Sequence, residues 1–237
     1  MGTMVSPEIA TREEWRTRRL ALLAKEKELS RLRDELSRER RELPWVRVDQ
    51  EYVFDTVGGP RTLAELFGSK RQLLVYHFMF GTDWTEGCPI CSYWIDSFDG
   101  VAIHMAHRDV ELVAVSRAPL ERLQDYRTRM GWGIPWVSSL GNSFNFDFGV
   151  SFSEEQQAHG AEYNFASVAR PNDELPGVSV FARDGDGAVY HTYSCYSRGL
   201  DALNSAYQLL DLVPKGRDEQ ALPWPMAWLR RHDAYDE

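Results

Sequence analysis

This sequence has no long apolar runs, no apolar segment near its start and few basic residues relative to acidic ones. Each of these features excludes a class of protein. No stretch approaches the ~18 apolar residues of a membrane-spanning helix, and the first residues contain no apolar run of the kind found in secretory signals. Acidic residues outnumber basic ones, 36 to 27, which gives a net charge of −9. Nucleic acids and anionic membranes both favour basic surfaces. We therefore expect a cytoplasmic protein without a nucleic-acid or membrane partner.

Cysteine is also scarce, with three residues in 237. A secreted disulfide framework uses an even and denser set of cysteines, so that class is excluded. Cys88 and Cys91 lie close together in the motif CPIC, and Cys195 lies apart from them. In a cytosolic protein such a pair indicates redox or metal chemistry, and we expect Cys195 to be a lone buried thiol.

Glycine is absent from residues 7–42, and Pro7 is the only proline there. The abundance of Arg, Glu, Leu and Lys predicts a long helix. Apolar residues recur every seventh position, with Leu32 alone at the half-heptad positions, which is a thinner seam than a coiled coil presents. The seam consists of Trp15, Leu22, Leu29, Leu36 and Leu43. We expect residues 1–43 to form a helical extension that packs on its own domain or on a second copy in a homodimer; a recruitment arm is the alternative.

Residues 44–237 show the texture of one α/β domain. The apolar runs at 72–80 and 110–115 are typical of strands buried on both faces, and amphipathic segments follow them. Residues 178–193 predict a hairpin around an Asp-Gly-Asp-Gly turn. Residues 141–176 have the composition of an insertion, and the C-terminal tail is expected to pack back on the domain.

The order of these elements predicts the fold class. Strands separated by helices pair in parallel, and a hairpin adds antiparallel strands at one side of the sheet. This arrangement is a three-layer α/β/α sandwich with a mixed central sheet, as in thioredoxin. No internal repeat suggests another architecture.

The position of CPIC is more informative than its spacing. The motif follows the most apolar strand after a short loop and opens a predicted helix, with Pro89 suited to the first helical position. The free N–H groups and the dipole at a helix start favour a thiolate. Cys88 is therefore the expected nucleophile. Cys91, one turn deeper, is the expected resolving thiol of a dithiol–disulfide exchange.

Metal binding and simple structure are the alternatives for the cysteine pair. Half of a zinc site would need two further ligands, and His104 and His107 lie about 20 Å along the predicted helix at 1.5 Å per residue. A copper site formed by Cys88, Cys91 and His191 is a second hypothesis, because soft sulfur and imidazole suit copper. A binding module with incidental cysteines is a third. The dithiol reaction itself requires no cofactor.

Four other residues are candidate helpers. His77 interrupts the apolar strand just before the loop, and a buried histidine near a thiol could carry a proton; a core histidine bonded to a backbone carbonyl is the plainer interpretation. Asp83 could relay protons beside the thiol. Trp84 could form a wall of a substrate pocket, and Pro176 lies just before the predicted hairpin.

Several long motifs resemble those of a bacterial family. They are YHFMFGTDWTEGCPICSYWIDSFDG, HRDVELVAVSRAPL, GWGIPWVSS, NFDFGV and YHTYSCYSRGLD. The sequence is similar over nearly its whole length to a thioredoxin-like family labelled "predicted dithiol–disulfide oxidoreductase", and more distantly to peroxiredoxins. The resemblance implies an oxidoreductase that acts on a disulfide or small-molecule substrate and is served by a cellular thiol reductant.

The sequence departs from both better-known relatives at the site. Thioredoxins carry Gly-Pro between the cysteines, whereas Pro89 comes first here, as in more oxidising proteins. The thioredoxin cis-proline has its nearest counterpart in Pro176, which we expect to contact substrate. Peroxiredoxins place Pro and Thr before a single reactive cysteine and use an arginine, for which Arg198 is the candidate. Peroxidase activity is therefore a weaker expectation than disulfide exchange.

Overall fold

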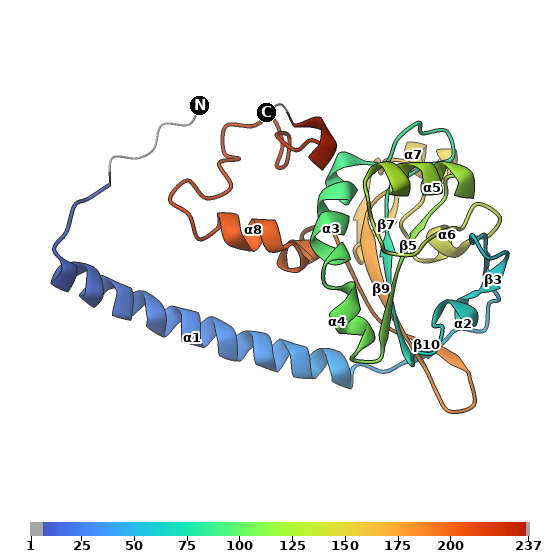
Figure 1. Ribbon diagram of the computed structural model, residues 1–237, viewed down its shortest axis with the longest axis horizontal. Coiled ribbons are helices and arrows are strands. Elements are labelled where there is room, and N and C mark those ends of the chain that lie inside the picture. The colour runs from blue at the N-terminus through green and yellow to red at the C-terminus, as the bar shows by residue number, and fades with distance from the viewer. Residues whose placement is uncertain (1–6, 236–237) are drawn as a thin grey trace.

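A six-stranded mixed sheet forms the centre of the computed structural model, which describes residues 7–235 (Figure 1). In spatial order the strands are β1 (Val46–Arg47), β10 (Val189–Tyr196), β9 (Gly177–Arg183), β4 (Gln72–His77), β5 (Val110–Ser116) and β6 (Trp136–Ser138). Strands β4, β5 and β6 run parallel, and β9 runs antiparallel to both β4 and β10. The two predicted apolar runs thus form adjacent central strands, as their burial requires.

Helices cover both faces of this sheet. One face packs against α3 (Pro89–Asp99), α5 (Leu120–Arg129) and α8 (Ser205–Leu210). The other packs against α2 (Leu63–Leu66) and α6 (Phe144–Asp147). Each face has its own apolar cluster, because successive side chains of a strand point to opposite faces. The expected three-layer thioredoxin-like sandwich with a mixed sheet is confirmed.

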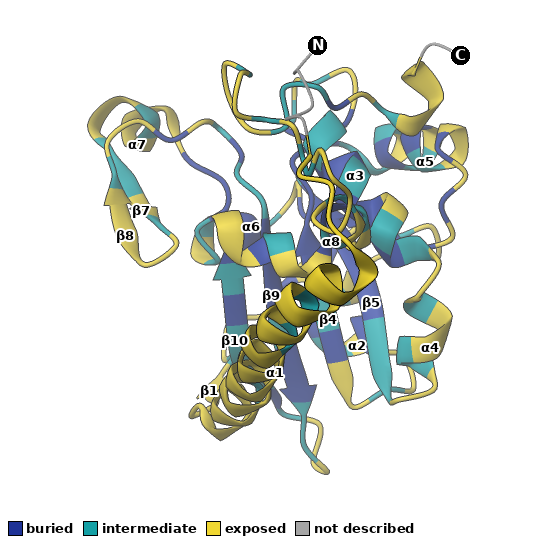
Figure 2. Cartoon of the chain, turned by 90° about the vertical axis from the view of Figure 1, so that its left-hand side faces the viewer, coloured by how far each residue is buried: buried dark blue, intermediate teal, exposed yellow. Residues whose placement is uncertain are grey.

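Helix α1 (Arg12–Glu42) extends away from the sandwich (Figure 1). It begins later than the composition predicts, because Thr11 and Glu14 form a reciprocal capping box. The apolar seam is 44–52% exposed, and Figure 2 shows α1 exposed along most of its length. Near its end, the Arg40 guanidinium lies 5.3 Å from the Tyr193 ring centroid. Within residues 7–235 nothing buries the seam, so the homodimer stays a prediction.

The helix that follows CPIC is shorter than predicted. The sequence suggested one helix reaching His107, but α3 ends at Asp99 and a separate α4 (Ala102–Ala106) follows. Gly100 caps α3, and the chain turns there before α4. Before β4 the chain forms two short strands, β1 and β2 (Val53–Phe54), which pair in different sheets.

The remaining elements are short. They are β3 (Arg61–Thr62), α7 (Glu154–His159), the hairpin β7 (Ala161–Tyr163) and β8 (Ala166–Val168), and the 3-10 helices η1 (Ser197–Leu203) and η2 (His232–Ala234). Asn204 caps α8 and separates that helix from η1. None of the helices formed by residues 7–235 is long and apolar enough to cross a membrane.

Candidate thiol site

Two cysteines lie at the start of helix α3, just beyond the end of strand β4. After β4 the chain turns through residues 81–87 and enters α3 with Cys88 as the capping residue and Pro89 in the first helical position. The Cys88 N–H donates to the Met79 carbonyl at 3.2 Å. The Met79 N–H in turn donates to the Cys91 Sγ at 3.3 Å. These bonds hold both cysteines against the chain that leaves the strand.

The two thiols differ in exposure and in ionisation. Cys88 is 9% exposed, whereas Cys91 is fully buried. The pKa of the Cys88 thiol is lowered, chiefly by a hydrogen bond from the Cys91 thiol and further by the N–H groups of Ile90 and Cys91 and the charge of Arg231, while burial opposes them. The pKa of Cys91 is raised well above its ordinary value by burial and by the nearby Cys88. The arrangement favours a thiolate on Cys88 and a protonated thiol on Cys91.

Tyr76 lies beneath the pair, on the same face of the sheet. Its ring packs edge-on against Phe78 and Phe98 and is fully buried. Its hydroxyl has no hydrogen-bond partner of good geometry in the described part of the chain. Burial and the neighbouring Cys91 raise the pKa of this phenol well above its ordinary value. A protonated phenol therefore lies beside the buried thiol.

Arg231, in the C-terminal tail, reaches the loop that carries Cys88. Its Nη2 donates to the Gly87 carbonyl at 2.9 Å, and its Nε donates to the Tyr126 hydroxyl at 2.9 Å. It also forms an ion pair with Glu86 at 3.1 Å. Sequence reasoning missed this residue, since it lies 144 positions beyond Gly87 and no motif marks it.

The arginine expected from the peroxiredoxin comparison lies elsewhere. Arg198 is in η1, its side chain is 87% exposed, and it pairs with Asp201 at 3.3 Å. Of these two arginines, Arg231 is the one whose charge acts on Cys88.

The structure gives different surroundings to the other predicted residues, Trp84, Asp83 and Pro176. The half-buried Trp84 packs against the apolar cluster that contains Cys88 and donates its indole N–H to Asp173 at 2.8 Å. Asp83 is exposed and makes no hydrogen bond or ion pair to any described residue. Pro176 immediately precedes β9 in trans geometry, unlike the thioredoxin proline. Their roles in proton transfer and substrate binding stay predictions.

The expectation for His77 changes with the structure. Its ring lies over Phe144 and Phe148, on the α6 side of the sheet, and its Nε2 bonds the Ser179 hydroxyl at 2.8 Å. Tyr76, the preceding residue, faces the thiols instead. This placement removes the geometric basis for a direct role of His77 at the cysteines. It also differs from the plainer expectation, because the partner is a hydroxyl rather than a backbone carbonyl.

The predicted copper set is not brought together. His191 packs against Phe148 and Phe181, on the same side as His77, and its Nε2 bonds the Ser194 hydroxyl at 2.8 Å. Cys88 and Cys91 lie in the cluster on the other face. In residues 7–235 no three side chains of His, Cys, Asp or Glu are placed to hold a metal ion together.

Cys195 is a separate thiol. It lies half-buried on β10, opposite Val178 of β9. Burial raises the pKa of its thiol, so its surroundings do not activate it.

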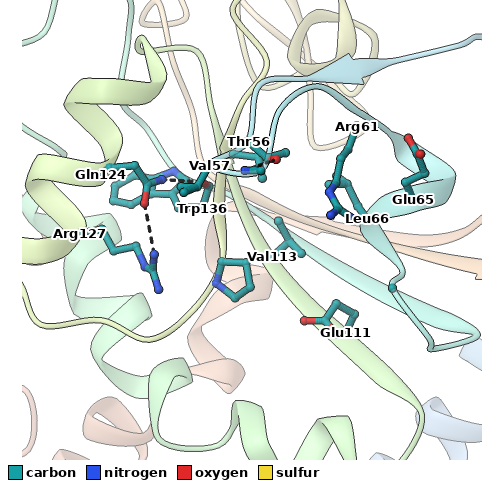
Figure 3. Close-up of a pocket in the computed structure, with 14 residues that line it drawn as sticks. Thr56, Val57, Arg61, Glu65, Leu66, Glu111, Val113, Gln124, Arg127 and Trp136 are labelled. Atoms are coloured by element: carbon teal, nitrogen blue, oxygen red, sulfur yellow. Dashed lines mark hydrogen bonds between the residues drawn. The ribbon is translucent and has the colours of Figure 1, made fainter.

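A separate cavity of about 340 Å³ lies at the β5–β6 side of the sheet (Figure 3). Glu111, Val113 and Trp136 come from its strands, and Arg61 and Arg127 lie on opposite sides of it (Figure 3). It contains none of the residues predicted from the sequence, and the mixed charges of its walls do not indicate one class of ligand.

Solved structures with a similar course of the chain include bacterial peroxiredoxins. Peroxidoxin BcpB from Mycobacterium tuberculosis is 15% identical, and the match covers 70% of this chain and 96% of that one with a TM-score of 0.45. The bacterioferritin comigratory protein of Xanthomonas campestris is 13% identical, with 66% and 90% covered and a TM-score of 0.44. Neither these identities nor these TM-scores bear on activity.

Family membership rests on the sequence itself. No curated protein matches the chain. A family model described as "Bacterial protein of unknown function (DUF899)" matches residues 4–235, nearly the whole chain. The chain therefore belongs to the bacterial DUF899 family.

Proposed function

We propose that this protein is a dithiol–disulfide oxidoreductase in which Cys88 attacks and Cys91 resolves. The carrying observation is the asymmetry of the pair. The more accessible thiol caps a helix start and has a lowered pKa, while its fully buried partner has a raised pKa. An attacking thiol needs thiolate character, and a resolving thiol needs protection until the mixed disulfide forms.

The reaction has two balanced steps. The Cys88 thiolate attacks one sulfur of a substrate disulfide, a Cys88–substrate disulfide forms, and the other substrate sulfur leaves as a thiolate. That thiolate takes up the proton that Cys91 loses. The Cys91 sulfur then attacks the Cys88 sulfur, which forms the Cys88–Cys91 disulfide and releases the second substrate thiolate. A cellular thiol reductant restores the dithiol.

The surroundings support these roles. Burial is the main cause of the raised pKa of Cys91 and persists, but the part due to Cys88 disappears once Cys88 is no longer an anion, so Cys91 becomes a better nucleophile. Arg231 acts as a positioning residue, since it bonds the Gly87 carbonyl directly before Cys88. Asp83 is proposed as a proton carrier at the exposed rim of the loop, and Trp84 as an apolar contact for substrate.

Trapping of the mixed disulfide tests the proposal. Reduced wild type, Cys88→Ser and Cys91→Ser are each mixed with oxidised glutathione and analysed by intact mass spectrometry. Wild type should lose two hydrogens and form the internal disulfide. Cys91→Ser should accumulate one glutathione adduct on Cys88, because the resolving step is blocked. Cys88→Ser should give neither product.

Cys195→Ser is the matched control, because it removes a thiol that lies outside the pair, and it should behave as wild type. An adduct that forms equally well in Cys88→Ser would contradict the assignment. Copper and zinc are quantified on the same purified samples. Stoichiometric metal that disappears in Cys88→Ser would make the pair a metal site and overturn the redox proposal.

A further inference from the structure

A second cavity lies at the β10 side of the sheet, away from the cavity at β5 and β6. It is enclosed between α6, the β7–β8 hairpin and β10. Its volume is about 250 Å³, which corresponds to roughly eight waters at ~30 Å³ each. Four aromatic residues contribute to its walls: Phe148, Tyr163, Phe165 and Tyr196. The Tyr163 and Tyr196 ring centroids are 5.5 Å apart, and those of Phe165 and Tyr196 are 5.8 Å apart. The cavity is thus a small aromatic enclosure.

The turn that carries Phe165 is under backbone strain. β7 and β8 are joined by Asn164 and Phe165 alone, and their φ angles are +54° and +59°. Such two-residue turns favour Asn-Gly, because Gly adopts positive φ at no steric cost. A phenylalanine at such a φ is sterically strained, and strain of this kind clusters at ligand sites. The strained turn keeps a ring that is 75% exposed at the rim of the cavity.

A chain of hydrogen bonds fixes the histidine in the cavity wall. It runs from His77 Nε2 to Ser179 (2.8 Å), to Ser194 (2.9 Å) and to His191 Nε2 (2.8 Å). A register shift between His191 and Tyr193 turns His191 to the same face as Ser194. Three bonds need three protons and the hydroxyls supply two, so one imidazole donates from Nε2 and the other accepts.

The buried end of that chain decides which histidine donates. His77 Nδ1 is buried and lacks a partner in the described residues. A proton there would be an unpaired buried donor, which is rarer and costlier than an unpaired acceptor. His77 therefore donates from Nε2, and His191 Nε2 accepts. Burial also lowers the pKa of His191, so this wall of the cavity carries no positive charge.

The charges at the rim have one sign. Asp147 and Glu162 line the cavity, and no lysine or arginine is among its lining residues. Asp147 accepts bonds from Tyr52 and Ser143, both on Oδ2, which leaves its other oxygen available. Glu162 is exposed and forms no ion pair within residues 7–235. Aromatic faces and carboxylates together attract a cation.

We propose that this cavity binds a small organic ammonium ion, with the aromatic rings around its methyl groups and the carboxylates of Asp147 and Glu162 at its charge. The inference does not rest on the proposed function, because neither Cys88 nor Cys91 lines the cavity; Tyr163 in its wall nevertheless lies close enough to Cys91 for the two groups to interact. The aromatic residues of its walls and the negative charges at its rim both favour a cationic ligand.

Choline and its uncharged carbon isostere, 3,3-dimethylbutan-1-ol, are the probes, titrated into the full-length protein by calorimetry and by ligand-observed NMR. Choline should bind at one site per chain, and the affinity of the isostere should be lower by at least about 10-fold. Glu162→Gln should weaken choline about 3-fold or more. The control Glu155→Gln changes an exposed carboxylate on α7 outside the cavity and should bind as wild type.

Phe165→Gly separates binding from folding. It removes the rim ring but relieves the positive φ, so the melting temperature should stay or rise while choline affinity falls about 5-fold or more. Equal affinity for the two probes, no saturable choline binding to wild type, or unchanged choline affinity in Phe165→Gly would each overturn the proposal.

Discussion

The two faces of the central sheet treat ionisable side chains in opposite ways. Tyr76 and His77 are neighbours on β4, yet Tyr76 faces the thiols and His77 faces α6. On the thiol face, a helix start and Arg231 lie close enough to favour an anion on Cys88. On the α6 face, burial lowers the pKa of His77 to about 3 and neutral hydrogen bonds satisfy its Nε2.

The difference shows what burial alone decides. Burial disfavours any charged form, so an unassisted group such as His77 stays neutral. A charged group persists in a buried place only where dipoles or opposite charge are supplied, as they are for Cys88. The same fold therefore favours an anion at Cys88 on one face and keeps the buried His77 neutral on the other.

The largest expected effect comes from removal of the thiol on the first face. Cys88→Ser should lower the rate of disulfide exchange with oxidised glutathione by about 100-fold or more, because no other thiol is activated. Ser179→Ala, which interrupts the hydrogen bonds on the other face, should leave that rate within about twofold. Stopped-flow measurements of both variants decide whether the two faces work separately. A large loss in Ser179→Ala would show that they are coupled.

Glu174 tests how strongly burial near α6 disfavours the charged form of a side chain. It is 2% exposed, it bonds Ser151 at 2.8 Å, and Arg117 lies 3.5 Å away and over the Phe146 ring of α6. Burial raises its pKa to about 7 from an ordinary 4.5, against the Ser151 bond and the Arg117 charge. The folded protein therefore binds this proton more tightly than the unfolded chain does.

The stability due to this proton is fully present below about pH 4.5 and is lost as pH rises through about 7. Between pH 5 and pH 8 the free energy of unfolding of wild type should fall by roughly 2–3 kcal/mol relative to Glu174→Gln, which cannot titrate. Urea denaturation at both pH values measures this difference. A difference that does not change with pH would show that Arg117 keeps the carboxylate charged.

Arg231→Gln should make the thiol face less favourable to an anion at Cys88. Removal of the guanidinium should raise the pKa of Cys88, because its positive charge favours the thiolate. The alkylation rate by iodoacetamide at pH 7 should fall severalfold. Arg230→Gln is the matched control, since among residues 7–235 the Arg230 side chain bonds only to carbonyls within the tail. Equal alkylation in the two variants would remove Arg231 from the site.

Tyr76→Phe is expected to have the smallest effect. The hydroxyl is buried without a well-formed hydrogen bond in the described structure, so its removal should change the free energy of unfolding by no more than about 1 kcal/mol and in the stabilising direction. Thermal unfolding checks this. A clear destabilisation would indicate that the phenol forms a real bond to the Cys91 thiol.

Much of the fold could be predicted from the sequence because its strongest signals are local. The apolar runs at 72–80 and 110–115 became adjacent central strands, and the turn in 178–193 became the β9–β10 hairpin. The cysteine pair was equally accessible, since its helix and loop adjoin it in sequence. Residues 141–176 gave no such signal, because their helices and strands are three to six residues long and have no sustained period.

The rest of the site depends on contacts that sequence patterns do not encode. Arg231 reaches Gly87 only through the folding of the tail. The opposite orientations of Tyr76 and His77 were, by contrast, available from the alternation of side chains along a strand. His191 could not be placed, because the shift in register on β10 reverses the face that simple alternation assigns to it relative to Ser194.

Polar bonds of the C-terminal tail to the loop before Cys88, to α3 and to α5 are partly solvated. Arg231 bonds that loop, Asp233 pairs with Arg129 of α5 at 2.7 Å, and His232 bonds Asp96 of α3 at 2.8 Å, all through side chains that keep some exposure. Such a segment can open locally at a free-energy cost well below that of global unfolding. A molecule can therefore lose the Arg231 contribution to Cys88 while its sheet stays intact. The fraction of molecules with a fully activated thiol is then governed by a local equilibrium of the tail, which amide hydrogen exchange resolves from the stability of the core.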